Sequence, residues 1–277
     1  MGNLSAMPTT VRQVIDALEQ RYPPAIAADW DAIGLVSGSP DNTVTSIVLA
    51  VDPVLAVVQE AIDCGAEMII THHPLFLHGV HSVAATTARG VVVEELIRNG
   101  ISLYAAHTNA DHARPGVSDA LAAALGVVEL QPIDPLASDP HLGTGRKGRL
   151  PTPMSLRDFA EQIVAALPST SAGIKVAGEP EAMIETVGVC GGAGDSLLPF
   201  VADLDVYVTS DLRHHRAQDH LADSACALID VPHWAGEWPW LPVAAAQLAA
   251  DLTAGGASVE LRVSAVVTDP WNWHTGG

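Results

Sequence analysis

The sequence predicts an α/β protein built on mostly parallel sheets, and three observations lead to this class. Short apolar runs typical of buried strands alternate with stretches of helical periodicity. Strand, helix and strand follow one another early in the chain, as they do in parallel sheets with crossover helices. The hydrophobic fraction of 48% and the charged fraction of 16% are ample for a packed core, and 277 residues suit one large domain or two modest ones.

In the first half of the chain, helices and strands are expected to alternate. The expected elements are helix 11–18, strand 46–51, helix 53–63, strand 68–70, helix 91–99, strand 101–106 and helix 117–125. Val11, Ile15 and Leu18 share one face of the first helix, which Thr9 or Thr10 would cap. Pro53 suits the first turn of helix 53–63. Gly100 and Gly126 directly follow helices 91–99 and 117–125, where glycine favours a helix end.

The second half repeats the α/β pattern. Its expected elements are helix 155–167, strands 174–176, 186–190 and 205–209, helix 213–224, strand 227–231, helix 241–252 and strand 259–267. Residues 131–153 contain Pro, Gly and Asp and are interpreted as the boundary between two lobes. Lobe one is therefore expected at about 1–130 and lobe two at about 150–250, with a C-terminal strand and tail at 258–277.

The composition counts against several classes of protein. A net charge of −19 disfavours electrostatic binding to nucleic acid or anionic membranes. Residues 1–10 lack the pattern of a signal peptide, and no apolar run reaches the ~20 residues that span a bilayer. Cys64, Cys190 and Cys226 are few, distant and odd in number, which fits reduced thiols. A soluble, cytoplasmic protein is expected.

Two adjacent histidines follow the predicted strand at 68–70. Neighbouring side chains of an extended segment point to opposite faces, so His72 and His73 reach one pocket only where the backbone turns. Pro74 ends the strand and favours such a turn. The alternative is one histidine in the core and one on the surface, and the pair alone does not decide between them.

Metal-capable side chains recur at four predicted strand ends, where functional groups of parallel sheets gather. They are His72 with His73, His107 with Asp111, Asp211 with His214 and His215, and His233 with Glu237. The last pair is four residues apart, so one helical turn would place both on one face. Imidazole and carboxylate without thiolate suit Zn²⁺, Mn²⁺, Fe²⁺ or Co²⁺. One structural zinc would use about four of these ligands, whereas two ions would use more of them and leave positions for water.

Seven motifs together resemble the Nif-three-like proteins, also called GTP cyclohydrolase type 2 homologues. The motifs are Asp29-Trp-Asp-Ala-Ile-Gly-Leu35, Thr71-His-His-Pro-Leu-Phe76, His107-Thr-Asn-Ala-Asp111, Gly188-Val-Cys-Gly-Gly-Ala-Gly194, Asp205-Val-Tyr-Val-Thr-Ser-Asp-Leu-Arg-His-His215, His233-Trp-Ala-Gly-Glu237 and Thr268-Asp-Pro-Trp271. Each motif is weak alone. Their order is specific, and the resemblance covers nearly the whole chain.

The resemblance implies a two-lobed, three-layer subunit, a toroidal homohexamer and two divalent metal ions per subunit. The metal ligands that it implies are His72, His73, Asp111, His233 and Glu237. His107 matches a position near the metals with a supporting or catalytic role. Some relatives carry an additional mid-chain domain, for which residues 130–186 leave no room. Ala32 and Ser210 stand where Asn and Gly are usual, and neither is a ligand position.

The resemblance further implies a dinuclear metal-dependent hydrolase that opens the purine ring of GTP and releases formate. His107 or His214 would move protons, while Arg213, Arg216 and the turn Gly191–Gly194 would meet a triphosphate. That turn equally suits simple chain reversal, because glycine permits tight turns and no Walker lysine follows. Hydrolysis of a phosphoester or another nucleotide is the nearest alternative. A non-catalytic metal-binding ring or adaptor protein is the alternative from a different class.

Overall fold

A computed structural model describes residues 9–275 and divides the chain into two compact units. Within the described residues, unit 1 comprises 9–110 and 241–268, and unit 2 comprises 111–240 and 269–275. Each unit contains helices packed on a central sheet, so the predicted α/β class is confirmed. The prediction about a signal peptide concerned residues 1–10, of which residues 1–8 lie outside the described part of the chain.

Unit 1 is built on a five-stranded sheet with the order β13-β4-β5-β6-β2. Its strands are β2 (Gly34–Ser37), β4 (Ser46–Ala50), β5 (Met68–Thr71), β6 (Ser102–Ala105) and β13 (Glu260–Val263). The first four strands in this order are parallel, and β2 is antiparallel to β6. A separate antiparallel pair joins β1 (Thr9–Thr10) to β3 (Thr43–Val44). Parallel strands end at one edge, so the residues following β4, β5 and β6 lie close together.

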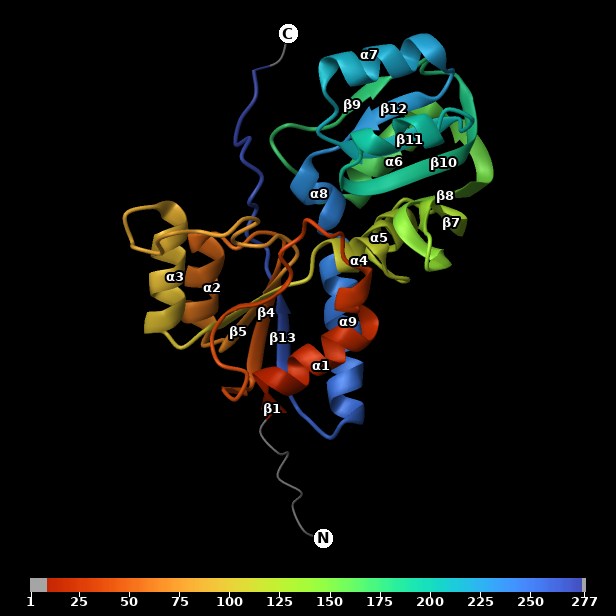
Figure 1. The fold of residues 1–277 in the computed structure, drawn as a ribbon. Helices are drawn as coiled ribbons and strands as arrows, with labels where there is room; N and C mark the ends of the chain where they lie inside the picture. Colours follow the sequence, from red (N-terminus) through yellow and green to blue (C-terminus); the bar gives the residue numbers. More distant parts are fainter. Residues whose placement is uncertain (1–8, 276–277) are drawn as a thin grey trace. The chain divides into compact units, whose positions relative to one another are not determined.

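The helices of unit 1 are α1 (Val11–Arg21), α2 (Leu55–Cys64), α3 (Ala88–Arg98) and α9 (Trp240–Ala254). Figure 1 shows α2 and α3 side by side, covering one face of the sheet. Thr10 caps α1 in a capping box with Gln13, and Gly65 ends α2 in the left-handed conformation. Both ends are where the sequence predicts them.

The sheet of unit 1 is apolar along its whole central part. Every residue of β5 is buried, as are the last four of β4. Val48 and Ile69 belong to one hydrophobic cluster with Val57 of α2 and Leu96 of α3. Strands covered on both faces need apolar residues at successive positions, which explains why the sequence shows apolar runs rather than alternation.

Unit 2 is built on a six-stranded mixed sheet with the order β7-β8-β10-β11-β12-β9. Its strands are β7 (Val128–Leu136), β8 (Asp139–Ser155), β9 (Lys175–Ala177), β10 (Met183–Ala193), β11 (Val206–Ser210) and β12 (Ala227–Asp230). β10, β11 and β12 are parallel, whereas the other neighbours pair antiparallel. The α-helices are α5 (Val117–Ala124), α6 (Leu156–Ala166), α7 (His214–Asp223) and α8 (His233–Glu237), and α4 (Thr108–His112) connects the units along the chain.

Residues 131–153, interpreted above as a boundary between lobes, form paired strands inside unit 2. β7 and β8 pair antiparallel from Val128 opposite Arg149 to Leu136 opposite Asp139. β7 is an edge strand, where prolines such as Pro132 and Pro135 do not break a second ladder of hydrogen bonds. The Pro- and Gly-rich composition therefore marks a sheet edge here, and the compact units divide at 110/111, 240/241 and 268/269.

A fully buried arginine lies in β8. Arg146 forms an ion pair with Asp119 at 2.8 Å and is 0% exposed. Its guanidinium also donates to the backbone carbonyls of Gly143 at 2.7 Å and Gly145 at 2.8 Å. Asp119 in turn accepts the backbone N–H of Gly116 at 2.9 Å, so both charges have several hydrogen-bond partners.

Asp205 ties the start of β11 to β10. Its carboxylate accepts the backbone N–H groups of Glu185 at 2.9 Å and Thr186 at 2.7 Å, together with the Thr186 hydroxyl at 2.8 Å. Burial raises the pKa of Asp205, but these hydrogen bonds lower it by more, so the pKa lies below the usual range. The ionised carboxylate therefore stabilises the fold.

This arrangement predicts an acid-sensitive contribution to stability. Because the folded pKa lies below the unfolded value of about 4, the contribution is complete above pH ~5 and is lost as the pH falls through the folded pKa. We expect Asp205→Asn to be less stable than wild type at pH 7 and the difference to shrink toward pH 3. Urea unfolding at both pH values measures this. Asp203→Asn, at an exposed position two residues away, is the control that should show no such trend.

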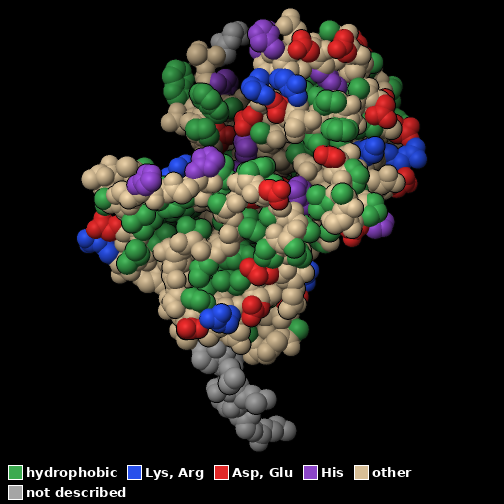
Figure 2. Space-filling model, viewed as in Figure 1, with side chains coloured by type: hydrophobic (Ala, Val, Ile, Leu, Met, Phe, Trp, Pro, Cys, Tyr) green, Lys and Arg blue, Asp and Glu red, His purple; other side chains and the backbone are tan. Residues whose placement is uncertain are grey.

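The described residues include no helix that is long and apolar enough to cross a membrane. Figure 2 shows hydrophobic and uncharged side chains over much of the visible face, with charged groups scattered between them, in keeping with the low charged fraction.

Cys64 is half-buried, Cys190 and Cys226 are buried, and all three are free thiols, as expected.

Candidate metal centre

The carboxyl ends of two adjacent strands in unit 1 bring three histidines together. His72 and His73 directly follow β5, and His107 follows β6, the next strand in the sheet. One ligand nitrogen from each of the three rings lies within 4.8 Å of the others. The ring centroids are 5.1 Å apart for His72–His73 and His72–His107, and 5.6 Å apart for His73–His107. Side chains from two successive strand ends thus lie close enough together to hold a metal ion.

The backbone turns at the histidine pair, which allows neighbouring residues to reach one cluster. β5 ends at Thr71, whose hydroxyl donates to the carbonyl of His73 at 2.8 Å. The backbone N–H groups of His72 and His73 donate to Ala50 at 3.1 Å and Val51 at 2.9 Å. His72 is 1% exposed and His73 is half-buried. The turn predicted before Pro74 is confirmed, and the alternative with rings on opposite faces is wrong.

Each ring of this cluster is fixed through its Nδ1 atom. His72 Nδ1 lies 3.0 Å from the carbonyl oxygen of Ala106, which can only accept, so Nδ1 carries the hydrogen and Nε2 has the lone pair. His73 Nδ1 donates to Asp52 at 2.7 Å, and His107 Nδ1 donates to Asp31 at 2.8 Å. Histidines that bind metals typically hold their other ring nitrogen in this way, which fixes the tautomer and the ring orientation.

Asp31, which belongs to the motif Asp29–Leu35, holds the ring of His107. Its side chain is 1% exposed and accepts from His107 Nδ1, from the backbone N–H of Thr108 at 2.9 Å and from the Thr108 hydroxyl. Burial raises the pKa of Asp31, but the hydrogen bonds from His107 and Thr108 lower it by more. The pKa of this carboxyl therefore lies well below its usual range. Asp31 is therefore a permanent negative charge that holds His107.

Unit 2 carries a second set of metal-capable side chains, on the single turn of α8. His233 begins this turn and Glu237 ends it, so the predicted i,i+4 geometry is confirmed. His233 Nε2 lies 3.0 Å from Glu237 Oε1, and Glu237 is 3% exposed. On its other side, His233 Nδ1 donates to Asp211 at 2.7 Å. Asp211 has a φ of 57°, a left-handed conformation that non-glycine residues seldom adopt and that is often found at functional sites.

The donor atoms of this set fit a divalent cation. With its Nδ1 hydrogen given to Asp211, a neutral His233 turns the Nε2 lone pair toward the carboxylate oxygen of Glu237. Two electron-rich atoms in contact repel unless a second proton or a metal ion lies between them. Imidazole nitrogen beside carboxylate oxygen is a donor set of Zn²⁺, Mn²⁺, Fe²⁺ and Co²⁺. Both sets of residues thus fit metal ions.

The predicted phosphate-binding turn has a different role. Gly191, Gly192 and Ala193 form the end of β10. A Cβ atom on Gly192 would overlap Glu237 Oε1 and lie 3.1 Å from His233 Nε2. Gly192 also has a φ of 71°. Glycine is therefore required here because the strand passes directly against the metal-capable pair.

We expect Gly192→Ala to weaken metal binding strongly, because the added methyl group displaces Glu237 or His233. Isothermal titration with Mn²⁺ or Zn²⁺ measures the affinity. Gly65→Ala is a matched control, since Gly65 has a φ of 70° and open space around its Cβ position. The control variant should lose about 1 kcal/mol of stability from left-handed strain while its metal affinity stays unchanged. Equal metal affinity in the two variants would contradict the prediction.

Asp111 lies in α4 and is half-buried. Burial, together with the negative charges of Asp111 and Glu237, raises the pKa of the Cys190 thiol to about 12. The two carboxylates are therefore both close enough to one buried sulfur for their charges to act on it. This proximity agrees with a shared role for Asp111 and Glu237 in unit 2.

His214 and its neighbours are placed differently from the other predicted site residues. His214 begins α7 and is exposed, and its ring contacts that of His215 with centroids 5.1 Å apart. Within residues 9–275, the groups able to hold a metal ion do not include His214. Arg213 pairs with Asp195, and Arg216 Nε lies 3.7 Å from the same carboxylate. The two arginines expected to meet a triphosphate are thus already engaged by an acidic side chain.

The chain matches the model of the family described as Duf34/NIF3 (NGG1p interacting factor 3) over residues 9–270. The chain belongs to the Duf34/NIF3 family. This confirms the resemblance drawn from the seven motifs, and it places the histidine and glutamate sets inside a domain that covers almost the whole sequence.

Family relatives include a GTP cyclohydrolase 1 type 2 homolog of Streptomyces coelicolor. It is 47% identical over 266 residues, covering 95% of this chain and 93% of that protein. The protein of the same name from Mycobacterium tuberculosis is 37% identical, with 96% of this chain and 97% of that protein covered. The latter alignment spans 374 residues, so the mycobacterial relative is longer within the matched region.

Solved structures in the family share the fold. A Staphylococcus aureus hypothetical protein superposes with a TM-score of 0.89 at 27% identity, covering 96% of this chain and all of that one. A Bacillus cereus protein related to NIF3 superposes with a TM-score of 0.88 at 24% identity, covering 95% and 99% of the two chains.

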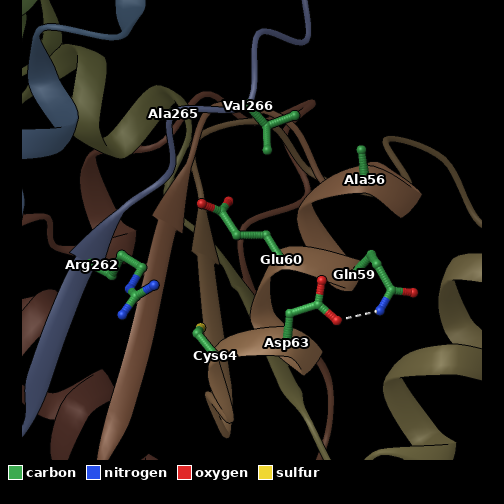
Figure 3. A pocket seen from close by; sticks show the side chains of 8 residues that line it. All are labelled: Ala56, Gln59, Glu60, Asp63, Cys64, Arg262, Ala265 and Val266. Carbon is green, nitrogen blue, oxygen red and sulfur yellow. Dashed lines mark hydrogen bonds between the residues drawn. The ribbon is translucent and has the colours of Figure 1, made fainter.

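A separate pocket in unit 1 lies along α2 and β13 and has a volume of about 680 Å³. Figure 3 shows the Asp63 carboxylate held by Gln59, with Glu60 and Cys64 on the same helix and Arg262 across from them. Glu60 is bonded by Ser264, and Arg262 pairs with Glu260. The charged groups of this pocket have partners within unit 1, and none of its lining residues belongs to the histidine cluster.

Proposed function

We propose that the protein is a dinuclear metal-dependent hydrolase. The proposed metal ligands are His72, His73, Asp111, His233 and Glu237. One observation supports this most strongly: His72, His73 and His233 each donate the Nδ1 hydrogen to a carboxylate or carbonyl oxygen, so each presents Nε2 for coordination. Core histidines that serve packing alone have no need of this uniform orientation.

A bound divalent pair would supply hydroxide at neutral pH by lowering the pKa of bound water. The residues of the chain have complementary tasks. His107, fixed by Asp31, holds its Nε2 atom ready to accept or return a proton. Trp30 contacts the ring of His107 edge-on with centroids 5.9 Å apart and is 59% exposed. An exposed indole beside a proton-transferring histidine suits stacking of a planar heterocycle.

GTP is the proposed substrate, with hydrolytic opening of the purine ring and release of formate. The names of the relatives support this choice, and so does the exposed indole of Trp30. Hydrolysis of a phosphoester or another nucleotide is the closest alternative, because it needs the same pair of ions. The alternative from a different class is a non-catalytic metal-binding ring or adaptor protein, which would bind the ions without turning over a substrate.

We also propose that the chain assembles as a homohexamer in the cytoplasm, as its family resemblance implies. Light scattering after size-exclusion chromatography gives the mass of the assembly relative to the 28.8 kDa chain. A mass near that of the monomer would exclude the hexamer without affecting the assignment of the ligands.

The activity is tested by loading the purified protein with Mn²⁺, Zn²⁺, Fe²⁺ or Co²⁺ and supplying GTP, other nucleotides or phosphodiesters. Formate release from GTP that disappears in Asp111→Ala supports the cyclohydrolase. Release of phosphate or alcohol instead supports the phosphoester hydrolase. No turnover with any metal, alongside stoichiometric metal binding, overturns the enzymatic proposal. His214→Ala serves as a comparison, since the exposed position of His214 predicts little effect on turnover.

A further inference from the structure

A second cavity opens directly beside His73. It has a volume of about 500 Å³ and lies in unit 1, between the first turns of α2 and α3. Asp52 and His73 line one end, so the pocket shares its wall with the histidine cluster. Arg89 of α3 also lines it. A molecule in this cavity would lie next to one of the proposed metal ligands.

Arg89 is unusual among the arginines of this acidic chain. Nine arginines form ion pairs with carboxylates, and Arg114 donates to the backbone carbonyl of Leu130. Within residues 9–275, Arg89 has neither an ion pair nor a side-chain hydrogen bond, although the chain carries 32 acidic residues. A guanidinium in a pocket with its donors unused is suited to binding a carboxylate or phosphate from outside.

The remaining wall is apolar and partly exposed. Val54 and Leu55, at the start of α2, are 38% and 46% exposed, and Val91 and Val92 face the pocket from α3. Both carboxylate oxygens of Asp52 are held, because they accept hydrogen bonds from His73 and Thr268. The first turns of both helices add a positive potential of the same sign as Arg89. The cavity thus combines an apolar surface with one exposed positive charge that has no ion-pair partner among the described residues.

We propose that this cavity binds an organic anion, with its carboxylate or phosphate group on Arg89 and its apolar body against Val54, Leu55 and Val91. In the proposed enzyme, this site holds the anionic end of the substrate or product while the reacting end lies at His73. The inference deepens the proposed function and rests on it for the role of His73. The binding itself depends only on the pocket.

The test uses phenyl phosphate and benzoate as anionic probes, benzyl alcohol as the neutral probe and benzylamine as the cationic probe. Each is titrated by calorimetry into the full-length protein, both metal-loaded and after metal removal by dialysis. The anions should bind both forms, and Arg89→Gln should weaken them by about tenfold or more, the effect of losing a hydrogen bond to a charged group. Methyl NMR spectra should shift at Val54, Leu55 and Val91. Comparing benzoate with phenyl phosphate shows which anion the site prefers.

Arg98→Gln is the matched control, because Arg98 is an exposed arginine of the same helix that is paired with Glu94. It should leave probe binding unchanged. The proposal is overturned if Arg89→Gln binds the anions as well as wild type does, if benzylamine binds as tightly as benzoate, or if no anionic probe binds. If anion binding requires metal and is unchanged in Arg89→Gln, the anion binds at the metal centre. That result would also overturn the proposal that it binds in the cavity. Absence of turnover with intact Arg89-dependent binding would instead count against the hydrolase alone.

Discussion

Glu237→Gln is expected to abolish most of the stabilisation that divalent metal gives this protein. Glu237 is buried and contacts His233 Nε2, so the amide keeps the shape of the side chain but removes the charge that balances the cation. A metal present at 1,000 times its Kd raises the free energy of unfolding by about 4 kcal/mol. If the variant binds about 100-fold more weakly, the same concentration adds only about 1.4 kcal/mol. Thermal unfolding with and without Mn²⁺ or Zn²⁺ measures the difference.

Glu161→Gln provides the control for this experiment. Glu161 lies on α6 in the same unit and is exposed, so its loss removes one negative charge without touching the site. Its metal-dependent stabilisation should equal that of wild type. A full metal response in Glu237→Gln would show that Glu237 is not a ligand, whatever the catalytic activity.

The sequence was most informative where one physical rule determines the outcome. Buried parallel strands need apolar runs, and their ends must meet at one edge of the sheet. The runs before His72 and before His107 therefore predicted both the strands and the gathering of the histidines. Pro74 made the turn at the histidine pair predictable, and the four-residue spacing made the contact between His233 and Glu237 predictable.

Partners from distant parts of the chain were much less predictable. Asp31 lies 76 residues from His107, and its role follows from tertiary packing that no local pattern encodes. Gly192 looked like part of a phosphate turn, because glycine in a sequence signals conformational freedom but not what lies beside it. The same limit applies to β7, whose prolines indicated a loop until its position at the sheet edge was known.

Both metal-capable sets use the same means of orientation, although they lie in different units. Asp52 and Asp31 hold histidines in unit 1, and Asp211 holds His233 in unit 2. Asp211 takes a left-handed backbone conformation directly after Ser210. A strained residue at this point agrees with a requirement for the carboxylate to face His233. The carboxylates that support the histidines are thus as much a part of the site as the ligands.

The buried ion pair of unit 2 predicts the largest effect on stability outside the metal site. Arg146→Met removes a guanidinium that is 0% exposed and leaves the Asp119 carboxylate without its counter-charge. The carbonyls of Gly143 and Gly145 also lose their donors. Removing one partner of a buried pair costs about 3–5 kcal/mol, because the remaining charge stays desolvated. We expect a loss of this size in urea unfolding at pH 7.

Arg149→Met is the matched control, because Arg149 lies on the same strand but is exposed and pairs with Glu185 at the surface. Surface ion pairs contribute about 0–1 kcal/mol, so this variant should remain close to wild type. Equal stability of the two variants would show that the Arg146–Asp119 pair contributes no more than a surface contact. A selective loss in Arg146→Met would show instead that β8 is anchored by a charge pair in the interior, because its partner Asp119 lies on α5. The strand that the composition indicated as part of a boundary between lobes would then be one of the most strongly held elements of unit 2.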